Sequence, residues 1–192
     1  MFLNRTRELG YLSERYAAGR AEIVVLYGRR RVGKSALLFE WSEGKPCIFF
    51  FARRADKATL LGEFSQVIRA FSADSPAPDD FTYPSWGAAF SAIAELAAER
   101  RLVVILDEFP YLVEADPELP TLLQREWDLR LQHTQIFLAL SGSIQSVIQQ
   151  QVLDPIQLSS SLSRILADPA AKERLQVELA SNDLQTAVLI VG

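Results

Sequence analysis

The chain has 192 residues, 49% of them hydrophobic and 23% charged, so it can form the core of one domain and is not disordered by composition. Its net charge of −4 argues against general binding to polyanions such as nucleic acids. The charge is divided unevenly. Residues 1–54 contain eleven Lys and Arg but five Asp and Glu, whereas residues 55–192 contain nine Lys and Arg but nineteen Asp and Glu. This distribution indicates a local anionic ligand near the basic end.

Helices and strands are predicted to alternate along the chain. Apolar residues at helical spacing predict helices over residues 6–18, 34–42, 60–71, 86–98 and 119–131. Continuous apolar runs predict strands over residues 23–27, 48–52, 102–106 and 136–140, and Ser72–Pro84 is predicted to be a loop. Such strands are typical of a mostly parallel sheet that is covered by helices on both faces, so the expected fold class is α/β.

A phosphate-binding motif follows the first predicted strand. Gly28–Ser35 match the pattern G-x-x-x-x-G-K-[ST] between a strand and a helix, which is the context this motif requires. The glycines allow the backbone to approach phosphates, Lys34 would reach the β- and γ-phosphates, and the hydroxyl of Ser35 would bind Mg²⁺. The predicted nucleotide-binding residues are Gly28, Arg29, Arg30, Arg31, Val32, Gly33, Lys34, Ser35 and Ala36. The three arginines either add positive potential or are solvated loop residues.

An acidic pair follows the third predicted strand. Asp107 and Glu108 come directly after an apolar run, as in a Walker B motif. We predict that Asp107, together with Ser35, binds Mg²⁺ and that Glu108 is the general base for an attacking water. A solvated turn is the alternative interpretation of the pair taken alone.

A polar sequence also ends the fourth predicted strand. Ser141 is our first candidate, and Ser143 the second, for a residue that senses the γ-phosphate or positions water. A simple turn after the strand is an equally open alternative, because Ser-Gly-Ser suits a turn.

Single residues exclude several other kinds of site. Cys47 is the only cysteine, so the chain has no internal disulfide and no cysteine-based zinc site, and we expect a small buried residue there. His133 is the only histidine and has no nucleophile signature around it, so we expect it at the surface or at a helix end. The longest apolar runs are far too short to cross a membrane, and the N-terminus has no signal-peptide pattern. We expect a cytoplasmic protein.

These motifs together resemble the archaeal-type ATPase family of P-loop NTPases, which is related to the AAA+ and STAND ATPases. The resemblance covers about residues 1–150 and is carried by residues 2–9, 26–35, 107–112, 127–128 and 141–143. It implies a three-layer P-loop NTPase fold of the ASCE type with strand order 5-1-4-3-2, with ATP as ligand and Mg²⁺ as cofactor. It also implies that Phe2–Leu9 lie near the adenine, where Arg5 is either a polar contact of the base or a structural pin.

The end of the chain departs from the family pattern. We predict an ATPase core over residues 1–150 and a divergent segment over residues 151–192, with a helix over 170–180. Residues 187–191 are either the fifth strand or the exposed end of a truncated product. Arg164 is a weak candidate for a sensor arginine, and no arginine finger is identified.

Three functions remain open from the sequence. The first is an Mg²⁺-dependent ATPase, or an ATP-driven switch coupled to a protein effector or to self-association, in which Glu108, Lys34 and Ser141 are the catalytic residues. The second is an ATP-binding module, or a truncated fragment, that lacks a lid and an arginine finger and does not turn over. A small-molecule kinase ranks lowest, because few arginines follow Ser143. A role with nucleic acids rests on family analogy alone.

Overall fold

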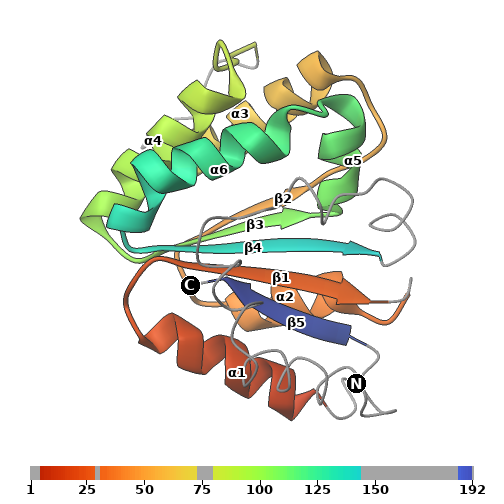
Figure 1. The fold of residues 1–192 in the computed structure, drawn as a ribbon, viewed down its shortest axis with the longest axis vertical. Helices are drawn as coiled ribbons and strands as arrows, with labels where there is room; N and C mark the ends of the chain where they lie inside the picture. Colours follow the sequence, from red (N-terminus) through yellow and green to blue (C-terminus); the bar gives the residue numbers. More distant parts are fainter. Residues whose placement is uncertain (1–4, 29–30, 73–79, 144–185, 192) are drawn as a thin grey trace.

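The computed structural model describes residues 5–28, 31–72, 80–143 and 186–191. These residues form one sheet between two layers of helices (Figure 1). The strands are β1 (Glu22–Gly28), β2 (Cys47–Phe51), β3 (Leu102–Asp107), β4 (Ile136–Ser143) and β5 (Thr186–Val191). The helices are α1 (Thr6–Ala17), α2 (Lys34–Ser42), α3 (Lys57–Ser72), α4 (Trp86–Glu99), α5 (Phe109–Ala115) and α6 (Leu119–Leu129), with a 3₁₀ turn, η1, at Leu131–His133.

The strand order confirms the predicted fold. The sheet runs β2-β3-β4-β1-β5, which is the expected order 5-1-4-3-2 counted from the other edge. The first four strands are parallel, and β5 pairs with β1 in the antiparallel direction. The carboxyl ends of β1, β3 and β4 therefore lie along one edge of the sheet, which brings together Gly28, Asp107 and Ser141.

Two layers of helices cover the sheet. Helices α3, α4 and α6 lie over one face, and α1 and α2 lie over the other (Figure 1). Alternate residues of the four parallel strands pack against the two helix layers: Val25 packs in the core under α3, α4 and α6, whereas Val24 packs in the core under α1 and α2. All six residues of β3 are buried, as expected for a central strand with both faces covered.

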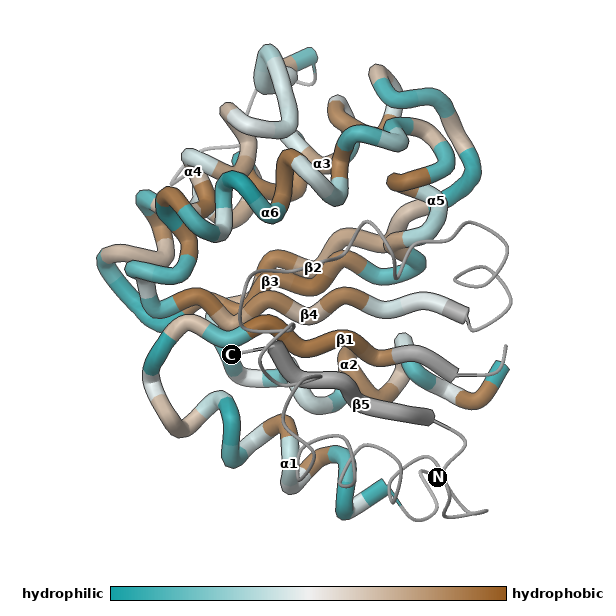
Figure 2. Tube along the Cα trace, viewed as in Figure 1, coloured by the Kyte–Doolittle hydropathy of each residue, from teal (hydrophilic) through white to brown (hydrophobic). Residues whose placement is uncertain are grey.

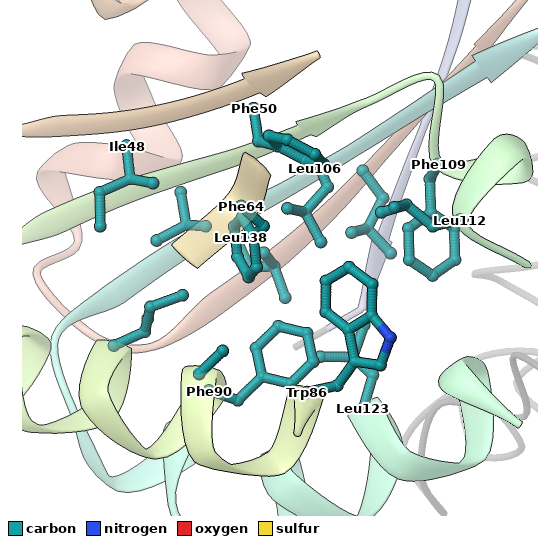
Figure 3. Close-up of a cluster of buried hydrophobic side chains, with 14 of the residues drawn as sticks. Ile48, Phe50, Phe64, Trp86, Phe90, Leu106, Phe109, Leu112, Leu123 and Leu138 are labelled. Carbon is teal, nitrogen blue, oxygen red and sulfur yellow. The ribbon is translucent and has the colours of Figure 1, made fainter. Parts of the chain in front are cut away.

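The larger core is built around aromatic side chains. Phe64 of α3 lies 5.6 Å from Trp86 and 6.1 Å from Phe90 of α4, measured between ring centroids, and all three side chains are buried (Figure 3). The hydrophobic residues of the strands form a continuous band in the middle of the molecule (Figure 2). This core supports β3 and β4, whose ends carry the candidate site.

Some helix boundaries differ from the predictions, because a side-chain hydrogen bond or a short additional element determines where the helix begins or ends. Helix α3 begins at Lys57, three residues early, because the Asp56 carboxylate accepts a hydrogen bond from the backbone N–H of Thr59 at 2.9 Å. Helix α5 was not predicted, because its seven residues are too short for a clear apolar period. Helix α6 ends at Leu129 rather than at residue 131, where the 3₁₀ turn takes over.

The fourth strand is longer than predicted. It continues through Ser143, and its last residues pair with β1, with Ser141 opposite Leu26 and Ser143 opposite Gly28. The alternative that Ser141–Ser143 form a turn is therefore wrong. Residues 187–191, for which a fifth strand was one of two expectations, lie in strand β5. The predicted helix 170–180 and Arg164 lie outside the described residues.

Two expectations about single residues had different outcomes. Cys47 is only partly buried, and the expectation of a buried residue was wrong, because β2 lies at an edge of the described sheet and α2 packs over β1 and β3 instead. His133 is exposed at the end of the 3₁₀ turn, as expected. In the described part of the chain, no helix is both long enough and apolar enough to cross a membrane.

Candidate functional site

The phosphate loop connects the end of β1 to the start of α2. Arg29 and Arg30 lie outside the described residues, and Arg31 is exposed with a φ of 64°. Gly33 has a φ of 82°, a conformation that glycine adopts without strain, and no atom lies within 4 Å of the position a Cβ would take. The backbone thus turns sharply in front of α2 and leaves open space beside Gly33.

Helix α2 begins at the residues the motif assigns to phosphate and metal. The N–H of Leu37 bonds to the carbonyl of Gly33 at 2.9 Å, which closes the first helical turn. Lys34 is only 6% exposed at the helix N-terminus, whereas Ser35 is half-buried and Ala36 is exposed. Unpaired N–H groups and the helix dipole make such an N-terminus attractive to anions.

Asp107 ends β3 with a buried carboxylate that is 1% exposed. Its Oδ1 atom accepts hydrogen bonds from the hydroxyl of Ser141 and from the backbone N–H of Glu108, the latter at 3.2 Å. Its Oδ2 atom is buried and has no hydrogen-bond partner within the described part of the chain. Such a carboxylate oxygen is costly to a fold unless something binds it, and a cation is the natural partner.

Ser141 lies on β4, the strand next to β3, and is 2% exposed. Besides donating to Asp107, its hydroxyl accepts a hydrogen bond from the N–H of Glu108 at 3.4 Å. Ser141 therefore orients the acidic pair. Glu108 is half-buried, with a left-handed φ of 53°, a strained backbone state that is often found at functional sites.

One hollow joins the two motifs. It has a volume of about 430 Å³, and both Ser35 and Asp107 line it. Its other walls are mostly aromatic: Phe39 of α2 is 71% exposed and Phe51 of β2 is 57% exposed. We did not predict this aromatic wall: Phe51 belongs to a strand that was expected in a sheet covered on both faces, and no role was assigned to Phe39.

The residues fit a magnesium ion that is shared with a phosphate ligand. Among the described residues, no three His, Cys, Asp or Glu side chains gather as a complete metal site. Mg²⁺ needs no such group, because it is commonly held by one or two protein oxygens together with phosphate oxygens and water. Asp107, Ser35 and Glu40, which line the hollow, carry side-chain oxygens, and the sequence motifs assign the first two of these residues to Mg²⁺.

The N-terminal segment also reaches the loop. Arg5 donates a hydrogen bond to the carbonyl oxygen of Val32 and pairs with Glu8 at 2.9 Å. Glu8 was predicted only as part of Phe2–Leu9, with no role of its own, although its position three residues after Arg5 was a signal for such a pair. Phe2–Asn4 lie outside the described residues, so their expected position near the adenine remains a prediction.

The strand order and the position of the loop between β1 and α2 define a P-loop NTPase fold. A family model described as "ATPase domain predominantly from Archaea" matches residues 2–175, and the chain belongs to that family.

Relatives and solved structures agree with this assignment. The chain is 29% identical over 153 residues to the uncharacterized protein MJECL04 of Methanocaldococcus jannaschii, covering 80% of this chain but 32% of the relative. It is 44% identical over 45 residues to the uncharacterized ATP-binding protein MJ0423 of the same organism, covering 23% of this chain and 76% of the relative. The Walker-type ATPase PABY2304 of Pyrococcus abyssi shares the fold, with a TM-score of 0.54 and 22% identity over 71% of this chain and 44% of that structure.

Proposed function

We propose that this chain binds ATP with Mg²⁺ and hydrolyses it. The observation that carries the proposal is the buried Oδ2 atom of Asp107, which has no partner in the described part of the chain and belongs to a side chain that lines one hollow with Ser35. Membership in an ATPase-domain family and the likeness to an ATP-binding protein support ATP as the nucleotide.

The proposed binding site combines the phosphate loop with two residues that would bind the metal. Backbone N–H groups of the phosphate loop would surround the phosphates, and Lys34 would neutralise the charge on the terminal ones. Asp107 and Ser35 would hold Mg²⁺, which would withdraw charge from the phosphate oxygens. In this arrangement Oδ1 of Asp107 stays hydrogen-bonded to Ser141, and Oδ2 is free to bind the cation.

The proposed reaction is attack of water on the terminal phosphorus, with loss of ADP. Glu108 is the base that takes the proton from the water. Ser141 supports the reaction by holding Asp107 and the backbone of Glu108 in place, and in this respect it is a positioning residue. Lys34 would stabilise the negative charge that develops on the β-phosphate of the departing ADP.

Steady-state phosphate release tests this assignment. We expect Glu108→Gln to lower the release rate by about 100-fold or more while ATP affinity stays close to that of the parent, since a general base contributes about 10²–10⁴ in rate. Lys34→Ala is the matched variant for binding, and we expect it to lose at least about 100-fold in affinity for a non-hydrolysable ATP analogue. Phosphate release that is unchanged in Glu108→Gln would show that Glu108 is not the base. Binding without release by the parent would favour the alternative of a non-catalytic ATP-binding module.

We further propose that the nucleotide state is coupled to a protein effector or to self-association in the cytoplasm. The support is indirect: the aligned part spans about a third of the relative MJECL04, which has room for other domains. A role with nucleic acids rests only on analogy with the family.

A further inference from the structure

One contact links two parts of the chain that the motifs treat separately. Arg5 immediately precedes α1, and its guanidinium donates a hydrogen bond to the backbone carbonyl of Val32, 27 positions further along the chain. Val32 is the residue before Gly33 in the phosphate loop. The Arg5 side chain is 12% exposed, so this contact is well shielded from solvent.

The peptide geometry gives the contact a consequence for the loop. The described residues contain no cis peptide bonds, so the unit between Val32 and Gly33 is trans. In a trans peptide, the carbonyl and the N–H of one unit point in opposite directions. By holding the carbonyl of Val32, Arg5 therefore directs the N–H of Gly33 away from itself. Orienting this N–H matters because the loop binds phosphate through its backbone N–H groups.

A second residue holds Arg5 in the position that makes the contact. The carboxylate of Glu8 lies 2.9 Å from the Arg5 guanidinium, and its side chain is 11% exposed. Because the two are three residues apart at the start of α1, the pair forms within one helical turn. A planar guanidinium can serve both acceptors at once through different nitrogens, which a lysine ammonium cannot do with the same geometry.

We infer that Arg5 is a positioning residue of the phosphate loop, and not a contact of the nucleotide base. With Glu8 it holds the Val32–Gly33 peptide so that the Gly33 N–H faces the bound phosphates. This inference rests on the proposed function, and of the two roles that the family resemblance implied for Arg5 it selects the structural pin. It also makes phosphate binding depend on the first turn of α1.

Two ligands separate these roles. Tripolyphosphate carries the phosphate chain of ATP without the adenosine, so it reports on the loop alone. Calorimetric titrations with Mg²⁺ would compare ATP and tripolyphosphate on the full 192-residue chain. We expect Arg5→Ala to weaken both ligands by the same factor, about tenfold, which is the usual contribution of a charge-assisted hydrogen bond. We expect Arg5→Lys also to weaken the binding of both ligands equally, but by a smaller factor than Arg5→Ala.

Arg7→Ala is the matched control. Arg7 is exposed in the same helical turn, and replacing it removes a positive charge without touching the loop. We expect the tripolyphosphate affinity of this variant to equal that of the parent, which would separate a positional effect of Arg5 on the loop from a loss of positive potential. Thermal unfolding without ligand shows whether each variant is folded, and Arg5→Lys provides the test if Arg5→Ala does not fold.

Three results would overturn the inference. Weaker ATP binding with unchanged tripolyphosphate binding would make Arg5 a base contact. Unchanged affinity for both ligands in the Arg5 variants would make the contact with Val32 irrelevant to binding. If the unsubstituted chain bound neither ligand, the proposed function itself would fail. This outcome is distinguishable from the first two, because it is measured without any Arg5 variant.

Discussion

Folding and ligand binding place opposite demands on Asp107. Its carboxylate is almost completely buried, and one of its oxygens has no partner in the described part of the chain. Burying a charged oxygen in this way destabilises a fold, whereas the same oxygen is a good ligand for a divalent cation. We therefore interpret Asp107 as a residue whose environment suits binding at the expense of stability.

Asp107→Asn tests this interpretation. The substitution keeps the size of the side chain and removes its charge, so we expect the ligand-free variant to be as stable as the parent or more stable by about 1 kcal/mol. We also expect Mg²⁺ to have no effect on the affinity of the variant for ATP. Urea unfolding and ATP titrations with and without Mg²⁺ measure the two effects, with the exposed Asp80→Asn as control. A variant that unfolds more easily and still binds ATP in a Mg²⁺-dependent way would contradict the interpretation.

The thiol of Cys47 offers a test of local burial. Burial raises the pKa of this thiol, and a hydrogen bond with Ser42 and the charge of Lys45 only partly offset that increase. Because the thiolate is the reactive form, a raised pKa means less thiolate near pH 8 and slower reaction. We expect a disulfide reagent such as Ellman's reagent to react with the folded chain more slowly than with the chain unfolded in guanidinium, with the rate still rising above pH 9. Equal rates in the two states would show that the thiol is fully solvated.

At the scale of elements, local hydrogen bonds determine where the helices begin. The hydroxyl of Ser85 accepts a hydrogen bond from the N–H of Ala88 at 3.2 Å, which satisfies one of the free donors at the start of α4. Helix α4 carries Trp86 and Phe90 into the larger core, so its start also sets the position of these rings.

Ser85→Ala should therefore lower the free energy of unfolding by about 1 kcal/mol. Ser85→Gly is the informative comparison, because glycine is itself a good N-cap and should cost only about a few tenths of a kcal/mol. Denaturant unfolding of the parent and both variants provides the numbers. If the glycine variant lost more stability than the alanine variant, the cap would not be the reason for the effect.

Several elements were predictable because their signals are local. The helix over residues 34–42 and the fully buried strand β3 follow from short sequence patterns, and the resemblance to a known family supplied the strand order. The hydrogen bond between Ser141 and Asp107 joins residues 34 positions apart, and the one from Arg5 to Val32 spans 27. Such contacts depend on which strands and loops become neighbours, and no local pattern encodes that.

At the scale of the whole molecule, the sheet assembles the candidate site from distant segments. β1 lies between β4 and β5, and its carboxyl end leads into the phosphate loop, while β3 and β4 bring Asp107 and Ser141 to the same edge. The basic excess of residues 1–54 fits this arrangement, since the phosphate loop and Arg5 both lie in that region. An anionic ligand that binds together with Mg²⁺ at this edge would explain both features, because the anion matches the basic excess and the cation matches the buried carboxylate.

Equilibrium binding of ATP to the full 192-residue chain, with Mg²⁺ and with EDTA, is the most direct test of this account. We expect saturable binding that weakens by about tenfold or more when Mg²⁺ is removed, because the roles proposed for Asp107 and Ser35 require the cation. Lys34→Ala should lose at least about 100-fold in affinity under both conditions. A parent chain that does not bind ATP, or a Lys34→Ala variant that binds as tightly as the parent, would contradict the account.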